Sequence, residues 1–166
     1  YDHFLVFVYD ITGIDEEVVI GGLVVDIGTT TVSALIIDME NGQVLAKGST
    51  GNGQIRYGAD VINRIIESQK PGGQEKLQKA IVVETLNPLI AKMCSETGFD
   101  PDHIYRMAVA SNTTMNHLLM GINADPLRKE PYIPTYFKTN SLFASDIGIN
   151  IHPDAHIIIS PNIGSY

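Results

Sequence analysis

The stretch Val24–Thr31 has the sequence VVDIGTTT, an apolar run that ends in Asp-x-Gly and a series of hydroxyl side chains. The apolar character of Leu23–Ile27 favours a strand buried on both faces at the centre of a sheet. The residues that follow suit a hairpin loop that binds phosphate. Gly28 lets the backbone approach an anion, and the amides of Gly28 to Thr30 can form a concave set of donors. The hydroxyl groups of Thr29 and Thr30 add further donors.

Asp26 stands near the end of the same strand. A carboxylate beside a phosphate does not bind it directly, so we expect Asp26 to act through Mg²⁺ or a metal-bound water, as a catalytic and metal-binding residue. Thr31 completes the expected phosphate-binding set of residues 28–31. The alternative is a polar hairpin connection with no ligand, and the stretch taken alone leaves that alternative open.

Length, composition and charge limit the class of protein. The 166 residues fit one domain, and 44% apolar against 18% charged residues is enough for a core of ordinary size. The net charge of -8 argues against binding nucleic acid through its phosphates. The single cysteine, Cys94, excludes a disulfide framework, a cysteine-rich zinc site and an iron–sulfur cluster within this chain. No apolar run is long enough to span a bilayer, so we expect a soluble, cytoplasmic protein with no membrane partner.

Residues 1–20 are expected to be a linker or the end of a preceding domain, although Phe4–Tyr9 has the apolar and aromatic character of a strand. Residues 21–166 are expected to form the domain itself. Its neighbouring strands should include an antiparallel hairpin, because Glu40-Asn41-Gly42 supplies a turn of the Asn-Gly type. The expected strands of the domain are Leu23–Ile27, Val32–Asp38, Val44–Ser49, Ile104–Ala110 and Ile157–Ser160.

The first predicted helix begins near Asp60 and ends before Pro71. Asp60 suits two roles at this place. It is either the N-cap, whose side chain binds a backbone amide, or a catalytic carboxylate near Mg²⁺, and the sequence leaves both open. The apolar face of the helix is expected to consist of Val61, Ile62, Ile65 and Ile66.

Two further helices are predicted later in the chain. A long one covers about residues 77–93, where Pro88 should kink it or divide it in two. A short one follows the fourth strand, and its first residues either cap it or bind an anion at its N-terminus. These residues are Asn112, Thr113 and Thr114. Residues 125–153 show no sustained period and are expected to be irregular, with one short helix or strand.

The phosphate hairpin and the later alternation of helix and strand resemble the first lobe of the actin, sugar-kinase and Hsp70 ATPase superfamily. In that superfamily the loop between the first two strands is the first phosphate-binding motif. The resemblance implies an α/β fold, a ribonuclease H-like (actin-like ATPase) lobe with a mixed central sheet flanked by helices.

A closer resemblance rests on three other segments: YGADVINRI at Tyr57–Ile65, SNTTMNHLL at Ser111–Leu119 and PYIP at Pro131–Pro134. Together they are similar to the ATPase portion of the reductive activators of corrinoid proteins, which are multidomain iron–sulfur proteins. The resemblance covers about residues 22–166. It implies an ATP-dependent protein that returns a corrinoid protein from Co(II) to Co(I), with ATP and Mg²⁺ as cofactors. The electron would come from a 2Fe–2S cluster in an upstream domain.

The resemblance also implies a corrinoid protein and a nucleotide as partners, with no nucleic acid and no membrane, and a homodimer stays an open alternative. This chain departs from the family pattern in two respects. One cysteine cannot hold the cluster, and the chain contains only the first lobe. We therefore expect the parent protein to be an ATPase and this chain alone to be inactive.

Two other classes of function are consistent with the same motif. A metabolite kinase of the sugar- and acetate-kinase superfamily would use the same phosphate loop, and Asp60 is the candidate general base in this chain. An actin-like protein that forms filaments would need polymerisation surfaces. A cysteine-rich domain upstream would favour the activator over the kinase.

Overall fold

The computed structural model describes residues 8–13 and 17–164, and a mixed five-stranded sheet organises them. The strands lie in the order β3-β2-β1-β4-β5. β1 is antiparallel to β2, and β2 to β3, whereas β4 is parallel to both β1 and β5. The strand bounds are Gly21–Ile27 for β1, Thr31–Asp38 for β2, Val44–Gly51 for β3, Ile104–Ser111 for β4 and His156–Ile159 for β5. The predicted ribonuclease H-like sheet is confirmed.

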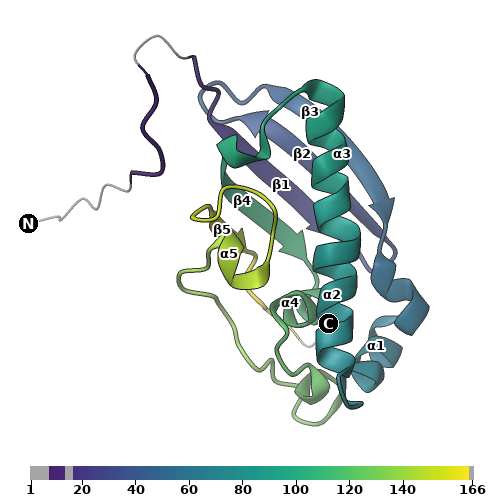
Figure 1. The fold of residues 1–166 in the computed structure, drawn as a ribbon. Coiled ribbons are helices and arrows are strands. Elements are labelled where there is room, and N and C mark those ends of the chain that lie inside the picture. Colours follow the sequence, from purple (N-terminus) through teal and green to yellow (C-terminus); the bar gives the residue numbers. More distant parts are fainter. Residues whose placement is uncertain (1–7, 14–16, 165–166) are drawn as a thin grey trace, which may run out of the picture.

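The helices are distributed along the crossovers between these strands. Their bounds are Gly53–Tyr57 for η1, Val61–Ser68 for α1, Gly73–Ile81 for α2, Val82–Leu86 for η2, Asn87–Thr97 for α3, Pro101–His103 for η3, Thr113–Met120 for α4, Asp125–Arg128 for η4 and Ala144–Ile147 for α5. Figure 1 shows α2 and α3 as one long rod across the sheet, with α1 and α4 near one of its ends.

The β2–β3 connection is the predicted tight turn. The amide of Asp38 donates to the carbonyl of Gln43 at 2.8 Å, and the amide of Gly42 donates to the carbonyl of Asp38 at 2.8 Å. The side chain of Asp38 also accepts from the amide of Glu40. The Asn-Gly signal was sufficient here because the turn is closed by its own residues.

The long helix continues past Pro88 as one rod, with a π-helical turn next to the place where a kink or a division was predicted. A π-helical segment, η2, separates α2 from α3, and Pro88 lies in the first turn of α3. Proline has no amide to donate to a carbonyl one turn earlier, and the π-helical turn lies directly before it. Gly98 ends α3 in a left-handed conformation. The sequence did not predict the π-helical turn.

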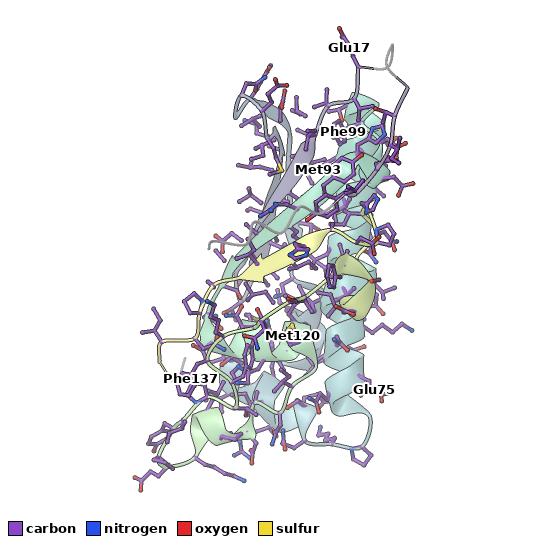
Figure 2. The ribbon with its side chains drawn as sticks, turned by 90° about the vertical axis from the view of Figure 1, so that its left-hand side faces the viewer. Glu17, Glu75, Met93, Phe99, Met120 and Phe137 are labelled. Carbon is purple, nitrogen blue, oxygen red and sulfur yellow. The ribbon has the colours of Figure 1, made fainter. Side chains whose placement is uncertain are left out.

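The core lies between the sheet and the α2–α3 rod. Leu23, Val25 and Ile27 of β1 are each 1% exposed and pack in one cluster with the apolar side chains of the rod. The approach is close at Gly48 of β3, where an added Cβ would lie 3.0 Å from atoms of Leu89 and Met93. In Figure 2 the rod runs along one side of the sheet.

The other face of the sheet is left open by the described residues. Val24 of β1 is 39% exposed and Ile158 of β5 is 57% exposed. The expectation that the first strand is buried on both faces is therefore wrong for this chain. Successive side chains of a strand point to opposite faces, so the residues between the buried ones, Asp26 included, face away from the rod.

The first helix begins after Asp60 as predicted, but it buries only part of the expected apolar face. Arg64 and Ile65 are buried, whereas Ile62 and Ile66 are 37% and 43% exposed. The expected apolar face is right for Val61 and Ile65, which pack in the core, and wrong for Ile62 and Ile66. Arg64 is buried on this helix instead.

The segment before β1 contacts the sheet without joining it. The strand expected at Phe4–Tyr9 falls largely outside the described residues, and residues 8–13 and 17–20 contain no strand. The ring of Tyr9 lies 5.8 Å from that of Tyr105 on β4. Within residues 8–13 and 17–164, no helix is both long enough and apolar enough to cross a membrane.

Candidate functional site

The loop between β1 and β2 is a tight hairpin closed by Gly28. The amide of Gly28 donates to the carbonyl of Thr31 at 2.9 Å. A Cβ at Gly28 would lie 2.8 Å from that same oxygen, so glycine is required for closure. The sequence predicted that this amide would point at an anion, whereas the structure uses it within the hairpin.

The three carbonyls of residues 28–30 are all bound from the protein side. The side-chain amide of Asn52 donates to the Gly28 carbonyl at 2.9 Å, and the backbone amide of Asn52 donates to the Thr30 carbonyl at 2.8 Å. Between them, the Arg64 guanidinium donates to the Thr29 carbonyl at 2.5 Å. The orientation of the hairpin peptides is therefore fixed by two side chains outside the hairpin.

Fixing the carbonyls also fixes the amides. A peptide unit is planar and trans, so its N–H points opposite to its C=O. With the carbonyls of Gly28 and Thr29 bound inward, the amides of Thr29 and Thr30 are directed outward. Within the described part of the chain, neither amide has a hydrogen-bond acceptor, and Thr30 is exposed. Two adjacent free amides form a donor pair for an anion.

The π-helical segment η2 supports Asn52 from behind. The hydroxyl of Thr85 donates to the Ala80 carbonyl at 2.7 Å and accepts from the amide of Gly53 at 3.0 Å. A Cβ at Gly53 would lie 2.8 Å from that hydroxyl oxygen, so the approach requires glycine. The irregular turn in the rod thus holds the residue next to Asn52, which in turn holds the hairpin.

The N-terminus of α4 lies beside the hairpin, because β1 and β4 end at the same edge, with Ile27 opposite Ser111. Asn112 is the N-cap of α4, and its side-chain oxygen accepts from the Met115 amide at 2.9 Å. Its side-chain amide also donates to the Thr29 hydroxyl oxygen at 3.4 Å. Two predicted site residues, Thr29 and Asn112, are therefore brought together.

Two other predicted residues, Thr113 and Thr114, are buried at the start of α4. Thr113 and Thr114 are 7% and 0% exposed, and the Thr114 hydroxyl is buried without a hydrogen-bond partner among the described residues. Their hydroxyl groups therefore do not face solvent at the hairpin. Thr31 is exposed at the start of β2, and its carbonyl closes the hairpin.

The two predicted carboxylates differ in their surroundings. Asp26 is exposed on the open face of the sheet, opposite Ser33 of β2 and two residues before Gly28. Asp60 is the N-cap of α1, and its two oxygens accept from the backbone and side-chain amides of Asn63, both at 2.8 Å. Capping therefore uses both oxygens of Asp60, while those of Asp26 remain open to a hydrated ion.

His117 connects α4 to the irregular segment that follows it. Its Nδ1 lies 2.7 Å from the Thr113 carbonyl, and its Nε2 accepts from the Thr135 amide at 3.1 Å. The proton is therefore on Nδ1, and the ring is neutral. Burial lowers the pKa of His117, although the hydrogen bond to Thr113 raises it in part. The side chain of His117 is completely buried.

Asn52 and Arg64 were not predicted as site residues from the sequence. Asn52 was hidden in a glycine-rich stretch, Gly51–Gly53, that carried no motif. Arg64 did give a signal, because it lies three residues after Val61 and four before Ser68, on one helical face. No group of three or more metal-ligating side chains occurs in residues 8–13 and 17–164.

Comparisons with known proteins bear on the family and the fold of the chain. A family model described as the RACo middle region matches residues 21–166. The corrinoid activation enzyme RamQ of Eubacterium limosum is 32% identical over 153 residues, which make up 92% of this chain and 26% of that protein. A solved structure of a reductive activator for corrinoid, iron–sulfur protein has a TM-score of 0.87 and 38% identity, and the match covers 92% of this chain and 24% of that one.

The chain thus spans about a quarter of the length of these two relatives. The family model begins at Gly21, the first residue of β1, and extends over the whole sheet and its helices. The resemblance indicated by the hairpin and by the three further segments is confirmed, and the chain belongs to the RACo middle region family.

Proposed function

We propose that the full-length protein is an ATP-dependent activator of corrinoid proteins, and that this chain supplies the wall of its nucleotide site that binds phosphate. The observation that carries the proposal is the hairpin, whose carbonyls are bound inward while the amides of Thr29 and Thr30 remain free. Membership of the family and the names of the two relatives support the activator class.

The residues at the hairpin fit a nucleotide phosphate with Mg²⁺. The free amides and the hydroxyls of Thr29 and Thr30 are the donors that phosphate oxygens accept from. The exposed carboxylate of Asp26 is an oxygen ligand of the kind that Mg²⁺ takes, directly or through water. When bound, Mg²⁺ would neutralise charge on the phosphates during hydrolysis.

Asn112 sets the direction of one of these donors. A hydroxyl has one hydrogen to donate and can accept as well. Because the Thr29 oxygen accepts from the side-chain amide of Asn112, its own hydrogen is free for a different acceptor. In the proposed site that acceptor is a phosphate oxygen, so Asn112 contributes by orienting Thr29.

The proposed activation passes one electron from the reduced 2Fe–2S cluster of an upstream domain to Co(II), which oxidises the cluster and gives Co(I). This reduction is uphill, and ATP hydrolysis would offset its cost. Closure of two lobes around ATP can change the affinity for the corrinoid protein and the ligation of its cobalt, which couples the two reactions. This chain would contribute one of the two closing surfaces.

The metabolite-kinase alternative requires a general base within reach of an acceptor hydroxyl. Asp60 is a poor candidate for that role because both of its oxygens already accept hydrogen bonds from Asn63. The activator proposal needs no such base. An Asp60→Asn variant that kept full ATP turnover would agree with the capping role, whereas a loss of about 100-fold would favour a catalytic one.

The test uses the full-length protein with and without a corrinoid protein, measuring ATP turnover and the absorbance of Co(I). We expect stimulation by the partner and formation of Co(I) that depends on Mg-ATP. Asp26→Asn should lower turnover by about tenfold or more. Asp154→Asn, which changes an exposed carboxylate elsewhere, should not. Absence of both stimulation and Co(I) would contradict the proposal, and a phosphorylated small molecule would favour the kinase.

A further inference from the structure

Arg64 lies directly behind the phosphate hairpin, on the buried face of α1. Its side chain is 0% exposed, and among the fully buried residues that the structure describes it is the largest by volume. A guanidinium is always charged in proteins, and taking that charge out of water is costly unless hydrogen bonds and an opposite charge compensate. The surroundings of Arg64 therefore indicate what compensates for its burial.

All the groups that Arg64 contacts are neutral. Its Nε donates to the Gly58 carbonyl at 2.8 Å, and Nη2 donates to the Thr29 carbonyl at 2.5 Å. Nη1 lies 3.5 Å from the side-chain oxygen of Gln54 and 3.3 Å from the sulfur of Met115. These contacts account for at most four of the five N–H groups of the guanidinium, and they leave its charge without an ion pair.

Among the described residues, no carboxylate forms an ion pair with Arg64. Burial lowers the pKa of Arg64, and the nearby Asp60 carboxylate counteracts this only in part. The Asp60 oxygens are bound to Asn63 instead. A positive charge that Asp60 compensates only in part thus lies behind a hairpin whose free amides face outward.

We propose that Arg64 is the positioning residue for phosphate at this hairpin: it holds the Thr29 carbonyl inward so that the Thr30 amide faces the ligand, and its buried charge attracts the phosphate groups. The inference rests on the proposed function, because it assigns a role within the same nucleotide site. The Thr29 carbonyl and the Thr30 amide belong to one peptide unit. A cation on the carbonyl polarises that unit and strengthens its N–H as a donor.

The proposal differs from a purely structural role in what it predicts for ligands of different charge. A structural brace between α1 and the hairpin would affect folding, and any loss of binding would be shared by charged and uncharged ligands. Substitution of a residue that positions phosphate weakens the binding of ATP. It leaves the binding of adenosine, which has no phosphate, nearly unchanged. The ratio of the two dissociation constants therefore separates the two roles.

The experiment measures the dissociation constants of ATP and adenosine for the full-length protein by isothermal titration, together with the thermal unfolding of each variant. Arg64→Gln removes the charge, and Arg64→Lys keeps it but loses the planar fork. The matched control is Arg56→Gln, because Arg56 is an exposed arginine paired with Glu84 in the same region. We expect Arg64→Gln to raise the dissociation constant of ATP by about tenfold or more, which corresponds to about 1.4 kcal/mol. The dissociation constant of adenosine should change by less than about threefold.

The ratio of the ATP and adenosine dissociation constants for Arg64→Lys should lie between those of the wild type and Arg64→Gln. The ratio for Arg56→Gln should equal that of the wild type. The proposal is overturned if folded Arg64→Gln keeps the wild-type ratio, if both ligands weaken equally, or if neither Arg64 variant folds, since each outcome assigns a structural role. Failure of the proposed function would look different, because the wild type itself would then not prefer ATP to adenosine.

Discussion

His117 makes the stability of the fold sensitive to acid. Burial lowers the pKa of the folded imidazole, whereas the unfolded chain keeps a value of about 6.5, so the unfolded state binds the additional proton. The contribution of His117 is therefore fully present above about pH 6.5 and is lost as the pH falls below that value. Protonation of Nε2 would also remove the acceptor of the Thr135 amide.

Urea unfolding of the wild type and of His117→Gln at pH 5.5 and 7.5 checks this prediction. We expect the substitution to lower the free energy of unfolding at pH 7.5 by about 1–3 kcal/mol, because buried partners lose their hydrogen bonds. The variant should lose less stability than the wild type between the two pH values. His103→Gln, which changes a partly exposed histidine, is the control. Equal pH dependence in the wild type and His117→Gln would contradict the prediction.

Asn52 offers a nearly isosteric test of the hairpin. Asn52→Asp keeps the oxygen that accepts from the Gln54 amide but replaces the donor to the Gly28 carbonyl with a second, negatively charged oxygen. The hairpin should then lose one inward hydrogen bond and repel phosphate. We expect ATP to bind the full-length variant at least about tenfold more weakly. Asn41→Asp makes the same chemical change in the exposed β2–β3 turn, and a similar loss there would contradict the prediction.

The hydroxyl of Thr85 in the π-helical segment η2 is expected to stabilise the fold. Thr85→Val keeps the shape of the side chain but removes the acceptor of the Gly53 amide and the donor to the Ala80 carbonyl. The expected cost is about 1–3 kcal/mol of unfolding free energy, because a backbone amide loses its partner. Thr97→Val is the matched control, since Thr97 bonds the Met93 carbonyl at the exposed end of α3. Equal changes in denaturant midpoint would refute a special role for Thr85.

At the scale of elements, the sequence predicted what local chemistry determines. The N-caps Asp60 and Asn112 and the left-handed glycines Gly98 and Gly121 are fixed by residues a few positions away, so the helix ends were predictable. The strands were predictable for the same reason. The π form of Val82–Leu86 was not predicted, and its residue Thr85 contacts a loop about thirty residues earlier.

The same distinction applies to the candidate site. The hairpin sequence predicted Thr29 and Thr30 as donors, but not which amides would be free, because that depends on Asn52 and Arg64 across long loops. The burial of β1 was mispredicted because the apolar run does not specify whether one face or both will be covered. Periodicity alone could not decide that a charged residue of α1 lies in the core.

For the whole molecule, we expect the isolated 166-residue chain to bind ATP weakly. The hairpin is a surface feature with Thr30 exposed, so the ligand would contact only one of the two walls that we propose for the site of the full-length protein. If the other wall supplies half of a binding free energy of about 7–8 kcal/mol, the remaining affinity is about millimolar. Isothermal titration with Mg-ATP checks this expectation. A low-micromolar dissociation constant would mean that the hairpin is not the nucleotide site proposed.

The open face of the sheet affects how strongly separate copies of the isolated chain associate in solution. Val24 and Ile158 make that face attractive to another copy, whereas the net charge of -8 makes copies repel one another. The range of the repulsion is about 10 Å at 0.1 M salt and about 3 Å at 1 M. Added salt therefore removes the repulsion and leaves the attraction, so the chain should scatter more light in concentrated salt than in dilute buffer.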